Sequence, residues 1–201
     1  MLYAILQIFF KTLFSVFFRA RVIGKENMPA DGPIILAANH RSNWDPPFLA
    51  TYLDRPVSYM AKQELFEVPG LGWAITRCHS FPVKRGAADR GAIKAALQAL
   101  KNGSCVGLFP EGTRSKDGRL HKAEAGVALI AAMAKAPVIP AAIIGTDHIF
   151  SHGGILPQLT VVYGKPLFFE GQHHDKAELQ AFSQKIMDEI ARMINLDSKD
   201  M

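Results

Sequence analysis

The stretch PIILAANHRSNWDP, residues 33–46, joins a buried strand to the start of a helix. The apolar run 33–38 is short and continuous, which is typical of a strand buried on both faces of a parallel sheet. Asp45 followed by Pro46 is a common helix opening, with an N-cap carboxylate before a first-turn proline. His40 lies in the link between the two elements. The link is therefore either a well-capped helix start or a reactive site, and the rest of the sequence decides between them.

Short apolar runs alternate with helical patterns beyond residue 20. This alternation is typical of an α/β domain, a mainly parallel, mixed sheet covered by helices, and we expect a single such domain over 20–201. In the last helix, apolar residues recur every three or four positions, so it should cover the core. The predicted strands are 20–24, 33–38, 57–61, 80–83, 104–109, 137–144 and 159–164, and the predicted helices lie near 46–53, 69–77, 88–101, 123–135 and 175–195.

Residues 1–19 form a separate N-terminal segment, MLYAILQIFFKTLFSVFFR, that is almost continuously apolar. Gln7, Lys11 and Ser15 recur every fourth residue and make a narrow polar stripe. The stripe predicts an amphipathic helix lying in the membrane interface with its Phe-rich face in the lipid, in preference to a spanning helix with Lys11 at mid-depth. A helix docked on the globular core is the other alternative. A cleaved signal peptide is disfavoured, because no positive charge precedes the apolar run.

The charge balance is basic, with 23 Lys and Arg against 18 Asp and Glu. Residues 1–30 carry four basic side chains and one acidic, which favours an anionic membrane surface as a partner. No nucleic-acid motif is present, so no nucleic-acid partner is expected. The two cysteines, Cys78 and Cys105, form no CxxC pair and are typical of a reduced protein on the cytoplasmic side.

His40 and Asp45 could form a catalytic pair. Ligands of parallel α/β sheets bind at the carboxyl ends of the strands, where His40 lies. A neutral imidazole there can take a proton from a substrate hydroxyl if a second group holds its tautomer and stabilises the imidazolium. Asp45 can be that group if the loop is tight. Taken alone, this spacing fits the capped-helix interpretation at least as well.

Cations follow three other predicted strands. FPEGTRS, residues 109–115, supplies Glu111, Gly112, Thr113 and Arg114, and Arg114 could hold a phosphate with two parallel hydrogen bonds. Lys62 follows 57–61, and Lys84 and Arg85 follow 80–83. Each group alone is more simply a solvated basic loop. Converging on His40, they indicate an anionic substrate presented to a general base.

The ordered segments NHRSNWD, AKQELFEVPGLGW, FPVKRG, FPEGTRS and VIPAAI resemble the glycerolipid acyltransferase family, specifically the bacterial 1-acylglycerol-3-phosphate acyltransferases. The resemblance covers about residues 20–165. It implies that His40 is the general base and Asp45 its orienting partner. It also implies that Glu111, Gly112, Thr113 and Arg114, with Arg85 and Lys62, bind the acceptor phosphate. The segments HSFPVKR and RLHKAEAG depart from the usual family pattern.

The implied reaction moves an acyl group from a thioester of acyl carrier protein or coenzyme A to the sn-2 hydroxyl of lysophosphatidate, giving phosphatidate. No metal or other cofactor is implied. The enzyme would lie on the cytoplasmic face of the cell membrane, peripherally bound through residues 1–19.

Other functions are open at this stage. An acyltransferase for another lyso-lipid, such as a lyso-ornithine lipid or a lysophospholipid, would need the same residues. A non-catalytic membrane-binding module would keep the N-terminal helix but would not need His40, Asp45 and Arg114 together. A serine hydrolase is disfavoured, since no G-x-S-x-G elbow is present. The spacing of His148, His152, His173 and His174 matches no metal-binding motif.

Overall fold

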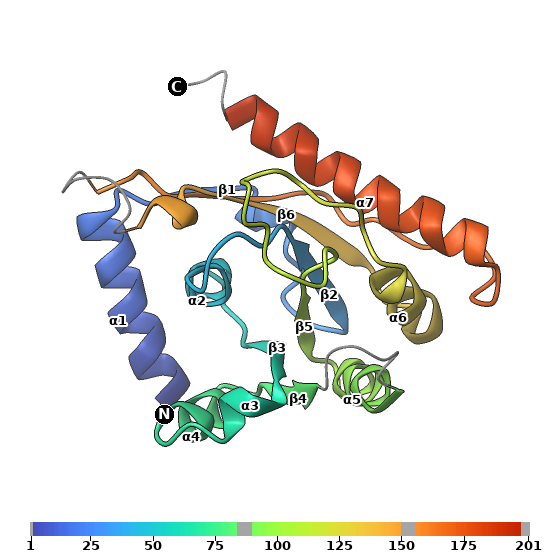
Figure 1. Cartoon of the computed structure of the whole chain (residues 1–201), viewed down its shortest axis with the longest axis horizontal. Coiled ribbons are helices and arrows are strands. Elements are labelled where there is room, and N and C mark those ends of the chain that lie inside the picture. The colour runs from blue at the N-terminus through green and yellow to red at the C-terminus, as the bar shows by residue number, and fades with distance from the viewer. Residues whose placement is uncertain (1, 84–89, 150–155, 198–201) are drawn as a thin grey trace.

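A seven-stranded sheet forms the centre of the protein (Figure 1). The computed structural model describes residues 2–83, 90–149 and 156–197. The seven predicted strands are all confirmed, each within a few residues of its expected ends. They are β1 (Arg21–Ile23), β2 (Ile34–Ala38), β3 (Val57–Lys62), β4 (Phe81–Val83), β5 (Cys105–Leu108), β6 (Val138–Ile144) and β7 (Thr160–Tyr163). Their order in the sheet is β1-β7-β6-β2-β5-β3-β4.

The sheet is mainly parallel and mixed, as predicted. Strands β2 to β6 run in one direction, and β7 pairs antiparallel with β6. Strand β1 pairs parallel with β7 and therefore shares its reversed direction. Strand β2 lies between β6 and β5, with Leu36 opposite both Ile139 and Gly107. The residues that follow β2 consequently emerge near the middle of the sheet's carboxyl edge.

The five helices predicted beyond residue 20 are present, and one short helix was not predicted. This helix, α3, lies between the predicted strand 57–61 and the predicted helix 69–77, in a segment to which no element was assigned. Pro69 and Gly70 separate it from α4. The helices are α1 (Leu2–Phe17), α2 (Asp45–Thr51), α3 (Gln63–Phe66), α4 (Leu71–Arg77), α5 (Arg90–Lys101), α6 (Gly126–Ala134) and α7 (Lys176–Asp197), with short 3-10 turns at Lys25–Asn27 and Thr146–His148.

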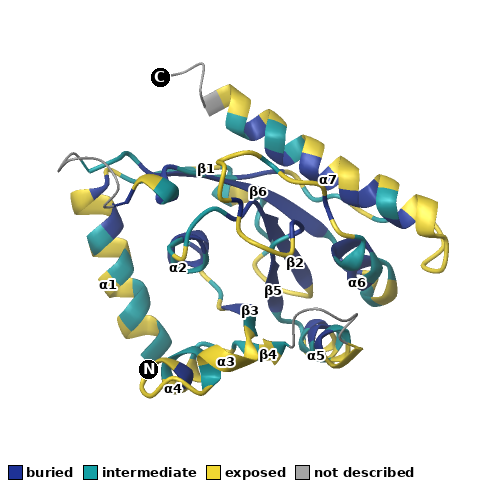
Figure 2. Ribbon diagram, viewed as in Figure 1, coloured by how far each residue is buried: buried dark blue, intermediate teal, exposed yellow. Residues whose placement is uncertain are grey.

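Helices cover both faces of the sheet, and the central strands β2, β5 and β6 between them are buried (Figure 2). The side chains of β2 alternate between two cores. Ile35 and Ala37 pack with α5, α6 and α7, whereas Leu36 and Ala38 pack with α1 and α2. Burial on both faces explains why this strand reads as a continuous apolar run. As predicted, the apolar stripe of α7 lies on the core.

Helix α1 is docked along α2. Phe14 is 0% exposed and its ring meets the ring of Phe48 edge-on at 5.0 Å. Gln7 Nε2 donates to the carbonyl of Leu53 at the end of the α2 segment, at 2.7 Å. The prediction that the Phe-rich face lies in lipid is therefore wrong for Phe14 and Phe18, which tertiary packing buries. In the described part of the chain, no helix combines the length and apolar character needed to cross a membrane.

Candidate active site

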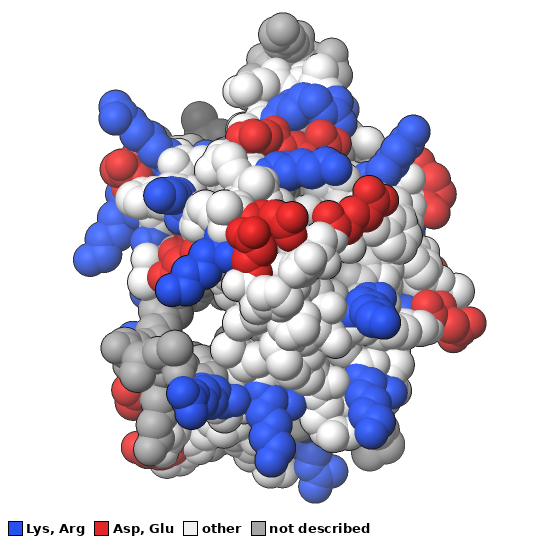
Figure 3. All heavy atoms as spheres, turned by 90° about the vertical axis from the view of Figure 1, so that its right-hand side faces the viewer, with Lys and Arg blue, Asp and Glu red and all other residues white. Residues whose placement is uncertain are grey.

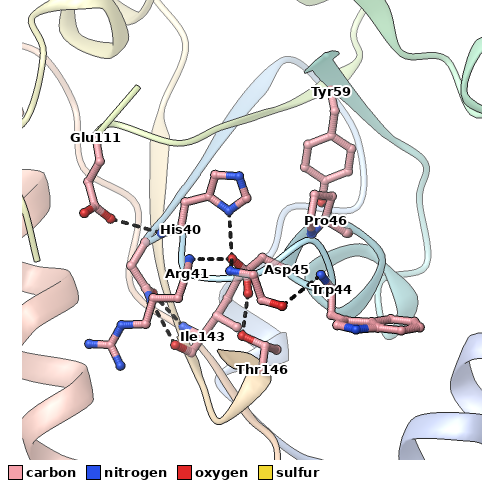
Figure 4. Close-up of polar contacts among 11 residues, drawn as sticks. His40, Arg41, Trp44, Asp45, Pro46, Tyr59, Glu111, Ile143 and Thr146 are labelled. Carbon is pink, nitrogen blue, oxygen red and sulfur yellow. Dashed lines mark hydrogen bonds and ion pairs between the residues drawn. The ribbon is translucent and has the colours of Figure 1, made fainter. Parts of the chain in front are cut away.

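The link between β2 and α2 places an imidazole against a carboxylate (Figure 4). Nδ1 of His40 lies 2.7 Å from Oδ2 of Asp45. The Asp45 side chain is fully buried, and that of His40 is 11% exposed. Figure 4 shows the second ring nitrogen of His40, Nε2, pointing away from Asp45. The pair thus has its acid inside the protein and one imidazole nitrogen turned away from that acid.

Four donors surround the Asp45 carboxylate. Besides His40, the backbone N–H groups of Arg41 and Ser42 donate to Oδ2, both at 2.7 Å. The Thr146 hydroxyl donates to Oδ1. An ionised carboxylate only accepts hydrogen bonds, so this set of donors suits it. Asp45 is the first residue of α2, but its carboxylate turns back to the preceding loop. It does not cap the helix, so the capped-helix interpretation of this residue is wrong.

The link is held to the neighbouring strand through Asn39, which is 0% exposed. Its side-chain amide donates to the Ile143 carbonyl at 2.8 Å, and its side-chain oxygen accepts from the Ile143 N–H at 2.7 Å. The side chain thus continues the pairing of β2 with β6 beyond the end of the strand. This leaves the following backbone free to turn at His40.

A stack of aromatic rings supports the imidazole. Phe109 lies parallel to the His40 ring, with centroids 3.9 Å apart and planes at 16°. Tyr59 stacks behind Phe109, and its hydroxyl donates to the Pro46 carbonyl at 2.9 Å. A Cβ atom at Gly107 would lie 2.3 Å from the Tyr59 ring, so a larger residue there would displace the stack. Burial raises the pKa of Tyr59, which keeps its hydroxyl protonated as a donor.

Glu111 joins the loop at residues 109–124 to the link that carries His40. Its Oε1 accepts from the backbone N–H of His40 at 3.0 Å, and its Oε2 accepts from that of His121 at 2.9 Å. The backbone N–H of Ser115 donates to the His40 carbonyl at 2.8 Å. Glu111 is buried, and both of its oxygens are used within the protein. Its position is that of a brace between the loops.

The remaining predicted site residues lie around this pair. Gly112 has φ +68°, a left-handed conformation that favours glycine, and directs the turn that carries the exposed side chains of Thr113 and Arg114. Lys62 is exposed at the end of β3. Arg85, like Lys84, lies outside the described residues. The structure therefore places both Asp45 and Glu111 in direct contact with His40, whereas the roles predicted for the outer cations stay predictions.

The loop beyond Arg114 is closed by Asp117. Its Oδ1 accepts from His121 Nε2 and from the Ser115 hydroxyl, both at 2.9 Å. The hydrogen bond from His121 lowers the pKa of the Asp117 carboxyl, with the backbone N–H of Arg119 and the Ser115 hydroxyl acting in the same sense. Since the backbone of Ser115 is also bonded to that of His40, the loop is tied directly to the residue that carries the imidazole.

Sequence reasoning missed the residues that support the pair from a distance. Thr146 is 101 residues from Asp45 along the chain, and it follows the apolar strand β6 in an ordinary-looking GTD turn. Phe109 and Tyr59 stand within predicted strands, where an aromatic residue gives no sign of a role at the site. Within the described ranges, no three His, Cys, Asp or Glu side chains are grouped so that they could hold a metal ion. His152, one of the four histidines considered for such a site, lies outside these ranges.

A histidine oriented by a buried aspartate is suited to accept a proton from a hydroxyl group. The family model described as Acyltransferase matches residues 19–144, which include this pair and the loop of Glu111. The chain belongs to this acyltransferase family. The matched residues run from just before β1 to the end of β6.

Three individual proteins that are similar to this chain share one type of name. The chain is 33% identical over 192 residues to the 1-acyl-sn-glycerol-3-phosphate acyltransferase of Bacillus subtilis, covering 92% of this chain and 93% of that protein. A chloroplastic 1-acyl-sn-glycerol-3-phosphate acyltransferase of Brassica napus is 33% identical over 189 residues, which cover 90% of this chain and 53% of that longer protein. The crystal structure of the 1-acyl-sn-glycerophosphate acyltransferase of Thermotoga maritima superposes with a TM-score of 0.77 at 29% identity, covering 94% of this chain and 78% of the other.

Proposed function

We propose that the chain transfers a fatty acyl group from a thioester to the sn-2 hydroxyl of lysophosphatidate, giving phosphatidate. The contact between His40 Nδ1 and the buried Asp45 carboxylate carries this proposal, since it leaves Nε2 to act on a hydroxyl. The names of the relatives from Bacillus subtilis and Thermotoga maritima support the choice of acceptor. The donor would be acyl carrier protein or coenzyme A carrying the acyl chain.

The proton moves in one direction during the reaction. His40 Nε2 accepts it from the acceptor hydroxyl as the oxygen attacks the thioester carbonyl, and Asp45 stabilises the imidazolium that results. Collapse of the tetrahedral intermediate breaks the C–S bond, and the imidazolium passes the proton to the departing thiolate. General-base assistance of this kind contributes about 10²–10⁴-fold. The acyl group goes directly to the acceptor, so no acyl-enzyme is required.

The acceptor phosphate would be held by the outer cations. Arg114 extends from the turn made by Gly112 and Thr113, which the Glu111 brace fixes relative to His40. Arg85 and Lys62 are the other proposed phosphate contacts. A guanidinium can give two parallel hydrogen bonds to a phosphate, which a lysine cannot. A phosphate monoester is close to dianionic at neutral pH, so this arrangement favours lysophosphatidate over acceptors with phosphodiester headgroups.

We also propose that the enzyme works bound peripherally to an anionic membrane, at the cytoplasmic face. Helix α1 presents Ile5, Ile8 and Phe9 to solvent, each more than half exposed, together with the exposed Lys11, and the exposed Arg19 follows the helix. Apolar side chains flanked by cations suit the boundary between headgroups and acyl chains. A product with two acyl chains cannot readily cross water, so an enzyme bound at the membrane would release it directly into the bilayer.

One assay tests the proposed reaction. Purified protein is supplied with acyl carrier protein or coenzyme A thioesters and a panel of lyso-lipids: lysophosphatidate, a lysophosphodiester and a lyso-ornithine lipid. We expect lysophosphatidate to be preferred, and His40→Ala to abolish transfer while the exposed His174→Ala does not. Arg114→Lys should lower kcat/KM for lysophosphatidate about tenfold or more. Preference for another lyso-lipid would overturn the assignment of the acceptor, and transfer by His40→Ala at the normal rate would overturn the mechanism.

A further inference from the structure

The hairpin made by α3 and α4, residues 63–77, displays large apolar side chains without covering them. Leu65, Val68, Leu71 and Trp73 are 39%, 44%, 42% and 58% exposed. In this segment only Gly72 is buried. A cluster of this kind on a folded protein marks a surface that contacts something other than water.

The hairpin is closed by its own backbone. The Gly72 N–H donates to the Val68 carbonyl at 2.9 Å, and a Cβ atom at Gly72 would lie 2.1 Å from the Phe66 carbonyl oxygen. Gly70 adopts φ +78° at the turn between the helices. Only glycine permits such an approach and such a turn. The apolar side chains are therefore held outward by a formed structure.

The exposed apolar side chains of the protein are concentrated on this hairpin and on α1. Among the described residues, 13 large hydrophobic side chains are exposed, and nine of them lie on these two elements. The two elements adjoin, since α1 contacts α4 and the rings of Tyr3 and His79 are 6.4 Å apart (Figure 1). The face over α5, α6 and α7 instead carries charges of both signs among uncharged residues (Figure 3). The nine are Ile5, Ile8, Phe9, Val16, Phe17, Leu65, Val68, Leu71 and Trp73.

We propose that the α3–α4 hairpin inserts into the bilayer together with α1, so that the two form one lipid-binding surface. The inference rests on the proposed function, because it explains how a lipid acceptor reaches the site. The hairpin begins directly after Lys62 at the carboxyl end of β3, and α1 packs on α2, the helix that begins at Asp45. A bilayer that contacts both elements would lie beside α2, which follows the catalytic link, and beside the carboxyl end of β3.

Charge and side-chain type favour a bilayer as the occupant. The Arg77 guanidinium lies 5.7 Å from the centre of the Trp73 ring, and a tryptophan beside a cation suits the headgroup boundary. Lys11 on α1 is exposed and adds attraction for anionic lipid. A second copy of the chain or a carrier protein would need a surface that pairs the acids Glu64 and Glu67 as well. At a bilayer, these can stay in the water layer.

Vesicle binding tests the hairpin with a matched control. Full-length protein is sedimented with vesicles of phosphatidylglycerol and phosphatidylethanolamine in equal parts, without substrates. The variant Leu71→Ser/Trp73→Ser is compared with Met133→Ser/Phe168→Ser, whose native side chains are 48% and 59% exposed but lie elsewhere. We expect the hairpin variant to lose about tenfold or more in vesicle partitioning, and the control to match wild type. Equal partitioning of the two variants overturns the proposal.

Tryptophan quenching supplies an independent readout. Brominated lipids should quench the Trp73 emission of the wild type, and Trp73→Phe should still bind vesicles but lose this part of the quenching. Absence of this difference in quenching overturns the proposal. Two other results would also overturn it. One is that wild type self-associates in sedimentation velocity and only the hairpin variant does not; the other is that the hairpin variant loses acyl transfer only when the donor is acyl carrier protein. Vesicle binding is measured without substrate and acyl transfer in a separate assay. The protein can therefore insert but lack the proposed reaction, or carry out the reaction without insertion, and the two results are distinguishable.

Discussion

Replacing Asp45 by Asn should impair acyl transfer moderately, because the loop dictates how the new amide lies. The three donors around Oδ2 are His40 Nδ1 and the N–H groups of Arg41 and Ser42. An amide oxygen can occupy this position, whereas an amide NH₂ there would face two backbone donors. Leaving these two partly buried donors unpaired costs up to about 2–6 kcal/mol, at roughly 1–3 kcal/mol for each fully buried donor. The amide should therefore keep its oxygen towards His40 and turn its NH₂ to Thr146, whose hydroxyl can rotate to accept.

The expected loss then comes from the missing charge alone. Hydrogen bonds to charged groups contribute about 1.5–3 kcal/mol and neutral ones about 0.5–1.5, a difference of about 1–2 kcal/mol opposite the imidazolium. This corresponds to a decrease of roughly 5–30-fold in kcat. A reversed amide would select the wrong imidazole tautomer, which costs about 10⁴-fold in a Ser–His–Asp triad.

Thr146→Val provides the discriminating partner for this variant. Combined with Asp45→Asn, it removes the acceptor of the buried amide NH₂, which should cost about 1–3 kcal/mol of additional stability. Thr146→Val alone should cost more, because it removes the hydroxyl that donates to the charged Asp45 carboxylate. The loss of stability in the double variant should therefore be smaller than the sum of the two single losses. Rates are measured by thiol release from a coenzyme A thioester, and folding is measured by urea unfolding. Wild-type kcat in Asp45→Asn, or a loss near 10⁴-fold with an intact fold, would refute the reasoning.

Three further changes test the supporting structure. Phe109→Leu should lower kcat several-fold with little change in KM, because the ring that stacks on His40 at 3.9 Å both positions the imidazole and attracts its cationic form; an unchanged kcat would exclude this role. Gly112→Ala should destabilise the fold by about 1–3 kcal/mol in urea unfolding, because φ there is +68° and the new Cβ atom would also meet the Glu124 carboxylate. Gly118→Ala is the control: φ is +72° but the space around it is open, so it should show the backbone cost without a contact of this kind. Burial raises the pKa of the Cys105 thiol from 9.0 to about 12. Between these two values only the unfolded chain ionises, so the thiol's contribution to stability should be present at neutral pH and decrease as the pH rises from 9.0 to about 12. Urea midpoints measured from neutral pH upward should therefore fall less steeply in Cys105→Ala than in wild type, and equal slopes would contradict the raised pKa.

Much of the fold was predictable because its signals are local. The seven strands appear as short apolar runs, and the continuous apolar run PIILAA indicates by itself that β2 is buried on both faces. The position of His40 just past a strand and the five-residue spacing to Asp45 are also local features. A tight loop can close over such a spacing without help from distant parts of the chain. For these reasons the sequence by itself determined the class of the fold, the place of the imidazole and its acidic partner.

Tertiary structure alone decided what surrounds this pair. Thr146 reaches Asp45 across 101 residues, and Glu111 reaches the His40 backbone across 71, because the central strands bring their carboxyl ends together. The sequence pattern placed the whole Phe-rich face of α1 in lipid, which is wrong for Phe14, because a pattern of apolar residues does not record which of them a neighbouring helix covers. Packing on α2 settled this by covering Phe14 and leaving Phe9 exposed. Contacts between distant segments depend on strand order and helix docking, which no local pattern records.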